Sequence, residues 1–173
     1  MGFSRMSKNF KCELLAFIIR EQKSVLDTAI SAAQQAHETA TSPQNVAENK
    51  YDTLGLEAAY LAEGQSRRVD ECLNTIKLFE LMKPLTFDED ESIQLGALIQ
   101  IRRDNGEEQW LYLGPAAGGF SFQYIVKDDV EINIKLITPS SPIGKSLVGL
   151  YEGDEFRVQI GHTEDRYEVM AIL

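Results

Sequence analysis

The fold is decided by one stretch near the start of the chain, residues 8–39, which is KNFKCELLAFIIREQKSVLDTAISAAQQAHET and contains neither glycine nor proline. Alanine, leucine, glutamate, glutamine and lysine dominate it, and these residues have high helix propensities. A second stretch of this kind, residues 48–82, is interrupted only by two glycines. Between them lies a turn sequence in which Ser42 can cap and Pro43 can open the second helix. The sequence therefore predicts two long helices with a tip near residues 42–48.

The two predicted helices can pack along one mostly apolar stripe. Alternating steps of three and four residues, the spacing of a coiled-coil seam, select one set of positions on each helix. The first set is Leu15, Ile18, Gln22, Val25, Ala29, Ala32 and Ala36, and the second is Gly55, Ala58, Ala62, Gln65, Val69, Cys72, Ile76 and Phe79. We therefore expect a long antiparallel α-helical coiled-coil hairpin.

One antiparallel register matches every apolar layer of the two stripes. In this register the numbers of facing residues add up to 87, so that Ala29 faces Ala58 and Gln22 faces Gln65. Two buried amides that bond each other would fix the register. Because the seam side chains become smaller toward the tip, the rod should be slender there. A slender rod suits insertion into a partner's cavity, and the alternative is an arm that packs against a second copy of itself.

The acidity of the chain is concentrated in its second half. The 173 residues carry a formal net charge of −10; residues 1–83 hold ten Lys and Arg against eleven Asp and Glu, whereas residues 84–173 hold seven against sixteen. The change coincides with a proline-containing acidic stretch, which is typical of a domain boundary. We expect two domains with these bounds. An acidic second domain argues against non-specific binding to a phosphate backbone through that domain.

Beyond Glu91 the apolar residues alternate with polar ones, as in β-strands. Asp104, Asn105 and Gly106 form a strong hairpin signal. A Ser-Pro pair at residues 141–142 predicts the start of one short helix. The strand candidates are residues 93–101, 109–114, 120–126, 130–137, 155–160 and 166–173. The second domain is therefore predicted to be α+β, with a mainly antiparallel sheet and one short helix.

The composition excludes several classes of protein. No stretch approaches the ~18 uninterrupted apolar residues of a membrane helix, and no secretory signal is recognised. The two cysteines, Cys12 and Cys72, are too few for a disulfide framework, so we expect a cytoplasmic protein without a membrane partner. The two histidines, His37 and His162, leave little for a zinc site or a nucleophilic triad.

The segment SPIGKSLVGLYEGDEFRV, residues 141–158, resembles the C-terminal domain of the Gre-type (GreA/GreB) bacterial transcript-cleavage factors. In that family a Ser-Pro pair opens a short helix, and an acidic Gly-Asp turn precedes the closing strands. Residues 48–68 are similar to the family's Glu-Asn…Tyr…Glu-Gly-Arg stretch beyond the coiled-coil tip. The resemblance implies a coiled coil that enters the secondary channel of RNA polymerase and an FKBP-like C-terminal domain that docks on the polymerase rim.

The resemblance also implies chemistry at the tip of the hairpin. Two carboxylates spaced Asp-x-x-Glu would help to hold a second Mg²⁺ and its water in the polymerase active site, so that backtracked RNA is cut. Here Glu48 matches the glutamate, but Asn45, a neutral amide, stands where the aspartate is expected. Asp52 lies four residues after Glu48 on the same helix face and could substitute. We expect Mg²⁺ shared with the polymerase and no cofactor of the chain's own.

Two further groups of residues are candidates for contacts. A basic cluster at one level of the rod is expected to face the 3′ end of the nascent RNA; in the 87 register its members are Arg20, Lys23, Arg67 and Arg68. The start of the short helix is expected to dock on the polymerase, through Ser140, Ser141, Pro142, Ile143 and Lys145. Ser140 stands where the family often has Asp or Asn.

The leading hypothesis is a monomeric factor that binds RNA polymerase and stimulates the polymerase's own RNA cleavage, without being an enzyme itself. Asn45 favours a second hypothesis, a non-cleaving relative that occupies the channel and inhibits Gre-type factors. A third hypothesis is an FKBP-like prolyl isomerase or chaperone. That activity needs an open aromatic cleft on the sheet, and a short helix packed tightly over that face would count against it.

Overall fold

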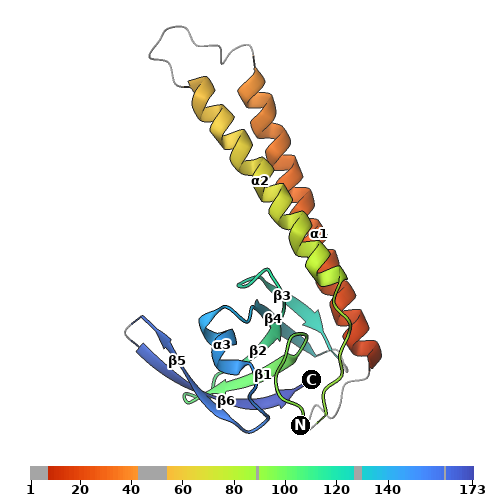
Figure 1. Ribbon diagram of the computed structural model, residues 1–173, viewed down its shortest axis with the longest axis vertical. Helices are drawn as coiled ribbons and strands as arrows, with labels where there is room; N and C mark the ends of the chain where they lie inside the picture. Colours follow the sequence, from red (N-terminus) through yellow and green to blue (C-terminus); the bar gives the residue numbers. More distant parts are fainter. Residues whose placement is uncertain (1–7, 43–53, 89, 127–129, 162) are drawn as a thin grey trace. The chain divides into compact units, whose positions relative to one another are not determined.

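The computed structural model of the chain describes residues 8–42, 54–88, 90–126, 130–161 and 163–173 (Figure 1). Within these residues two long helices precede a six-stranded sheet and one short helix, which confirms the predicted α+β class. The elements in chain order are α1 (Lys8–Thr41), α2 (Leu54–Glu80), β1 (Leu98–Arg103), β2 (Glu108–Leu113), β3 (Ser121–Ile125), β4 (Glu131–Ile137), α3 (Pro142–Leu147), β5 (Glu155–Ile160) and β6 (Thr163–Ile172). No helix among the described residues is long and apolar enough to cross a membrane.

The chain divides into two compact units. The hairpin unit comprises Ala16–Glu80, and the sheet unit comprises Leu81–Leu173 together with the described residues up to Leu15. The first turns of α1 thus belong to the sheet unit, where the Phe10 ring meets the Tyr124 ring edge-on, with centroids 5.8 Å apart. The assignment of two domains with a boundary between residues 83 and 84 stays a prediction.

The hairpin unit buries the stripe that the sequence predicts. Every predicted seam position from Ile18 to Ala36 on α1, and every one from Gly55 to Phe79 on α2, is buried or half-buried. Burial is deepest where the seam side chains are large, and Ile18 and Phe79 are fully buried. Toward the tip the α2 seam is made of glycine and alanine and is only half-buried. The seam therefore holds the helices together most firmly at the end far from the tip.

The register of the two helices differs from the predicted one, and the 87 register is wrong. The Nζ atom of Lys23 on α1 lies 3.3 Å from Oε1 of Glu80 on α2. The 87 register would place Lys23 beside Gly64, which is sixteen residues, or roughly 24 Å, away along α2. Alternating three- and four-residue steps place a seam residue every half heptad, so the two stripes still match after one helix is shifted along the other by such a step. The pattern therefore identifies which residues are buried but leaves several registers open.

The predicted pairing of two amides is absent for the same reason. Gln22 is buried, but its Nε2 atom has no hydrogen-bond partner among the described residues, while Gln65 is half-buried. An unpaired buried amide costs about 1–3 kcal/mol of stability. The apolar layers therefore determine the register in spite of a polar group that opposes it.

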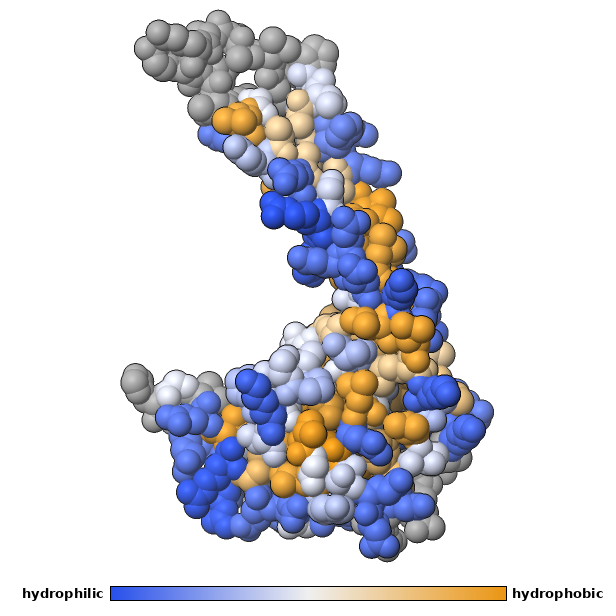
Figure 2. Space-filling view, in the orientation of Figure 1, coloured by the Kyte–Doolittle hydropathy of each residue, from blue (hydrophilic) through white to orange (hydrophobic). Residues whose placement is uncertain are grey.

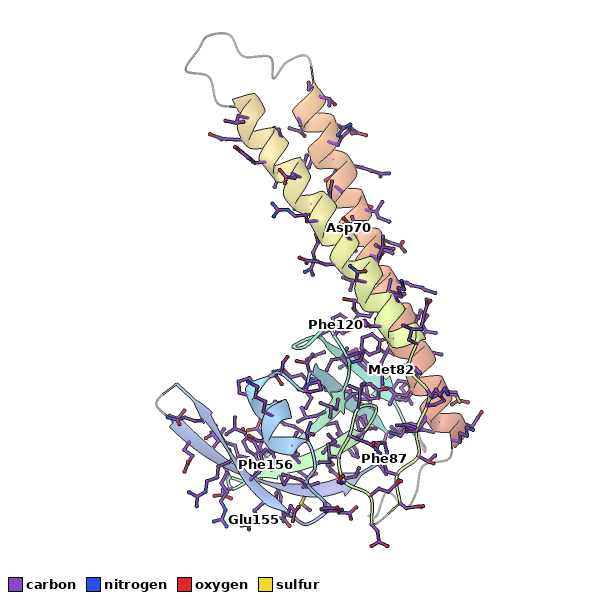
Figure 3. All side chains as sticks on the ribbon, in the orientation of Figure 1. Asp70, Met82, Phe87, Phe120, Glu155 and Phe156 are labelled. Atoms are coloured by element: carbon purple, nitrogen blue, oxygen red, sulfur yellow. The ribbon has the colours of Figure 1, made fainter. Side chains whose placement is uncertain are left out.

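The sheet unit is built on strands in the order β3-β4-β2-β1-β6-β5. Four of the five pairings are antiparallel, and β2 with β4 is parallel. The β1–β2 hairpin turns at the predicted position, where the Gly106 N–H donates to the carbonyl of Arg103 at 2.8 Å and Gly106 has φ of +87°. Helix α3 packs on one face of the sheet, with Leu147 fully buried in a core that includes Phe156 (Figure 3).

The first strand begins later than the alternation suggests. Residues 93–97 were expected to be strand, but β1 starts at Leu98. Ile93 donates to the carbonyl of Leu150 at 2.8 Å and accepts from Gly149 at 2.9 Å, so its backbone pairs with the end of the α3 segment. Gly96, with φ of +97°, then turns the chain into the sheet. The alternation of apolar residues is therefore not matched by burial here, because Ile93 and Ala97 are buried whereas Leu95 is 39% exposed.

Lys11 is buried within the sheet unit. Its side chain donates hydrogen bonds to the carbonyl of Gly96 at 3.1 Å and to the carbonyl of Leu173, and its Nζ atom lies 5.1 Å from the centre of the Phe87 ring. Burial lowers the pKa of Lys11 from 10.5 to about 7, because desolvation disfavours the charged ammonium.

The stability of the protein should consequently rise with pH through the titration of Lys11. Between about pH 7 and pH 10.5 the unfolded chain keeps a proton on Lys11 that the folded chain has lost, so raising the pH favours folding by up to about 1.4 kcal/mol per pH unit. Below pH 7 both states are protonated and this contribution is constant. Urea unfolding at pH 6 to 10 should show this slope for the natural chain but not for K11M. Equal slopes for both proteins would contradict it.

Cross-linking can test the register. After the native cysteines are replaced (C12S and C72A), K23C/E80C should be joined within one chain by a short bismaleimide, because these side chains meet. K23C/G64C is the matched control, since the 87 register would join that pair instead. The yield of each intramolecular product, read by mass spectrometry, decides between the two registers, and a dominant K23C/G64C product would overturn the observed one.

Candidate functional site

Asn45, Glu48 and Asp52 all lie outside the described residues, between the end of α1 at Thr41 and the start of α2 at Leu54. Their part in holding Mg²⁺ stays a prediction. Among the described residues, no three His, Cys, Asp or Glu side chains are grouped so that they could hold a metal ion.

The four basic candidates on the rod are exposed, but they do not form one cluster. Lys23 lies beside Glu80, and Arg67 is thirteen residues away from Glu80 along α2. The level of Arg67 is therefore roughly 20 Å from that of Lys23 along the helix axis. The expectation that all four share one level depended on the 87 register and is wrong. They form two separate pairs, Arg20 with Lys23 and Arg67 with Arg68.

Each of these cations also has an acidic neighbour on the hairpin. The distances are 4.0 Å from Arg20 to Glu21, 3.3 Å from Lys23 to Glu80, 3.8 Å from Arg67 to Glu63 and 3.7 Å from Arg68 to Glu71. Exposed ion pairs contribute only about 0–1 kcal/mol, so each of these pairs is weak. Contact of these cations with RNA stays a prediction.

The start of α3 is held by Ser141, as the sequence predicts. The Ser141 hydroxyl accepts a hydrogen bond from the Gly144 N–H at 3.1 Å and donates one to the carbonyl of Thr138 at 2.7 Å. Pro142 occupies the first turn of the helix, where a missing N–H costs nothing. The serine therefore acts as a helix cap, and its hydroxyl is engaged within the chain.

Gly144 is a residue of this site that the sequence reasoning missed. A Cβ atom at this position would lie 2.0 Å from the carbonyl oxygen of Thr138, which is impossible without moving the backbone. Because Gly144 has no side chain, the Thr138 carbonyl can lie against the first turn of α3, where it accepts the hydrogen bond from the Ser141 hydroxyl. The glycine two residues after Ser-Pro was the available signal, because a helix interior otherwise disfavours glycine.

The expected docking residues face in different directions. Ser140, Pro142 and Lys145 are exposed, whereas Ile143 is half-buried and packs against the core of the sheet unit. The Ser140 hydroxyl lies 3.1 Å from that of Thr138. The surface that a partner could touch here is therefore Ser140, Pro142 and Lys145, which we name the α3 surface.

Strands β1, β5 and β6 carry a second charged surface that the sequence reasoning did not single out. A hollow of about 480 Å³ lies there, and its lining includes Arg103, Arg157 and Arg166. The hydrogen bond from Arg103 to Asp165, 2.5 Å long, raises the pKa of Arg103. Arg157 and Arg166 pair with carboxylates on the neighbouring strand. Because each arginine is matched by an acid, the hollow has no surplus positive charge with which to bind an anion.

The aromatic side chains of the sheet do not favour a prolyl isomerase. Trp110, Phe122, Phe156 and Tyr167 are each at most 8% exposed. Phe156 and Tyr167 stack on each other with ring centres 5.4 Å apart. Helix α3 packs over the face of the sheet that carries Phe156 and Tyr167, through the buried Leu147. The tightly packed helix is the arrangement that counts against an open aromatic cleft.

Comparisons with known proteins connect this architecture with one family. Residues 88–173 match the model of the family described as "Transcription elongation factor, GreA/GreB, C-term". The chain is 25% identical over 169 residues to the transcription elongation factor GreA of Ralstonia nicotianae, covering 97% of this chain and 93% of that protein. It is 23% identical over 106 residues to the GreA of Polaromonas naphthalenivorans, and 27% identical over 105 residues to that of Verminephrobacter eiseniae. These two matches cover 61% of this chain, and they span only 61% and 60% of the two relatives.

Solved structures of similar proteins come from the same group. The chain is similar to the GreA factor homolog 1 (Gfh1) of Thermus thermophilus, with a TM-score of 0.36, 19% identity and coverage of 93% of both chains. It is also similar to a GreA/GreB elongation factor from Nitrosomonas europaea, with a TM-score of 0.34, 18% identity and coverage of 58% of this chain and 78% of that one. The family match over residues 88–173 decides the assignment: the chain belongs to the GreA/GreB family of transcription elongation factors.

Proposed function

We propose that this protein binds RNA polymerase as an elongation factor, with the α1–α2 hairpin inserted into the secondary channel and the sheet unit docked on the outer rim. The observation that carries the proposal is the GreA/GreB C-terminal domain over residues 88–173, preceded in the chain by a two-helix hairpin. The relatives that align over most of the chain are themselves transcription elongation factors.

The physical properties of the hairpin support the insertion step. From Ala16 to Thr41, α1 alone extends for roughly 39 Å. The seam contains small side chains toward the tip, as the sequence predicts. The hairpin half of the chain is nearly neutral, so a channel that carries nucleic acid would not repel it. The hairpin is thus long and carries no strong charge of either sign.

The α3 surface is the proposed contact with the rim. Ser141 and Gly144 fix the first turn of α3 rigidly, and this presents Ser140, Pro142 and Lys145 to solvent in a defined arrangement. A preorganised surface loses little conformational entropy on binding. Residues 84–173 hold sixteen acidic against seven basic side chains, so the sheet unit as a whole favours a protein partner over DNA.

Affinity for purified RNA polymerase tests this docking. K145E should weaken binding of the full chain roughly tenfold, about 1.4 kcal/mol, because it reverses a charge on the α3 surface. K135E is the matched control, since Lys135 is an exposed lysine on β4 outside that surface. Fluorescence anisotropy of labelled chain titrated with polymerase would measure both. Absence of binding by the natural chain at micromolar polymerase would refute the proposed function itself.

The activity at the tip belongs to the same proposal. Glu48 and Asp52 would help to hold a Mg²⁺ ion of the polymerase active site, and that ion would supply the activated water for RNA hydrolysis. Asn45 can accept or donate a hydrogen bond but carries no charge. We therefore expect stimulation of cleavage to be weak and to need more Mg²⁺ than a tip with a carboxylate at this position would need.

A backtracked polymerase complex provides the test of the tip. N45D should increase RNA shortening at least several-fold at low Mg²⁺, and E48Q should abolish it, while E57Q, a carboxylate on the first turn of α2, should leave it unchanged. RNA length on a denaturing gel gives the rate. Shortening that survives E48Q would contradict the assigned role of Glu48.

Asn45 also supports the second candidate function, a channel-occupying regulator that does not cleave. In this case the natural chain would bind the backtracked complex without shortening the RNA, and it would slow cleavage stimulated by an added GreA. The same assay therefore separates the two candidates, because both require binding and only one requires shortening.

A further inference from the structure

The hairpin carries a groove that neither the tip chemistry nor the α3 surface uses. It has a volume of about 520 Å³ and lies between the two helices, within the hairpin unit. Residues of both helices line it: Ile30, Ala33, Gln34, His37 and Glu38 of α1, and Ser66, Val69 and Asp70 of α2. The volume falls within the range of pockets that accept a side chain or a small ligand.

The floor of this groove is apolar, and its two carboxylates belong to different helices. Ile30 is 37% exposed, and Ala33 and Val69 are half-buried, so apolar surface faces solvent. Glu38 comes from α1 and Asp70 from the middle of α2 (Figure 3). On the visible face of the hairpin, apolar patches are likewise separated by hydrophilic side chains (Figure 2). The groove thus combines an apolar floor with negative charge.

The charge of the groove is not balanced within the described part of the hairpin. Arg20, Lys23, Arg67 and Arg68 each pair with another acid. Neither Glu38 nor Asp70 forms an ion pair with a described residue, although Asp70 is close in sequence to two arginines. An occupant with complementary charge would therefore be basic.

We propose that this groove holds a protein segment of RNA polymerase that presents an aliphatic or aromatic side chain flanked by lysine or arginine. The inference rests on the proposed function, since it concerns the hairpin inside the channel. The apolar side chain occupies the floor beside Ile30 and Val69, and the basic groups approach Glu38 and Asp70. RNA is disfavoured here because its phosphates would meet two uncompensated carboxylates.

Affinity measurements with charge-neutralised variants test the electrostatic part. E38Q/D70N should bind polymerase about three- to tenfold more weakly and with a smaller dependence on salt, because two ion pairs with the polymerase segment are lost. D27N is the matched control, as Asp27 is an exposed acid of α1 outside the groove. Unchanged affinity and salt dependence in E38Q/D70N, with the natural chain still binding, would overturn the groove proposal and leave the proposed function intact.

Photo-crosslinking identifies the occupant. A benzophenone amino acid at position 30, inside the groove, should cross-link in the polymerase complex to a polymerase peptide that contains lysine or arginine next to an apolar residue. The control is position 31, the adjacent residue, which does not line the groove. Cross-linking to RNA from position 30, or equal products from both positions, would refute the proposal. Failure of the natural chain to bind polymerase at all would instead remove the function on which the proposal rests.

Discussion

The packing of α1 against α2 along one seam is the constraint on which the arrangement of the hairpin depends. The seam determines which side chains face outward, and the register along it determines which outward side chains become neighbours. The ion pair between Lys23 and Glu80 shows that register directly. The observed register separates the basic residues of α1 from Arg67 and Arg68, and it places Ile30 and Val69 in the same groove.

A register chosen by apolar layers leaves some polar groups in unfavourable positions. Gln22 is the clearest case, since its buried Nε2 lacks a partner among the described residues. The large side chains Ile18 and Phe79 are fully buried, and burial of each contributes about 1.5–3 kcal/mol. Two such contributions exceed the cost of one unpaired amide, about 1–3 kcal/mol. Because apolar burial contributes more than the unpaired amide costs, the expected pairing of Gln22 with Gln65 does not determine the register.

The sequence predicts features that depend on local spacing better than those that depend on distant contacts. The seam positions, the Gly106 hairpin and the Ser141 cap follow from residues a few positions apart, and the structure confirms all three. The register, the start of β1 at Leu98 and the burial of Lys11 depend on residues far along the chain, for example on Leu173 meeting Lys11. Lysine is ordinarily exposed, so nothing in its immediate neighbourhood indicated that it would be buried.

The candidate site shows the same division. Ser141 and Pro142 were identified from their order in the sequence, whereas Gly144 becomes important only through its contact with the Thr138 carbonyl. The tip residues were identified by resemblance alone. The groove could not have been foreseen, because Glu38 and Asp70 line the same groove only in the observed register.

The distribution of charge around α2 gives the hairpin two chemically different sides. Successive residues of a helix are 100° apart, so Arg68 lies nearly opposite Ser66, which lines the groove. One side of α2 therefore presents a cation, and the other presents an apolar groove with Asp70. If Arg68 contacts RNA and the groove holds a basic protein segment, as proposed, this asymmetry would fix the rotational orientation of the hairpin. The hairpin half is nearly neutral in total, but its charges are unevenly distributed around α2. The proposed role would use both properties, since neutrality would allow entry into a channel and the uneven distribution would orient the hairpin there.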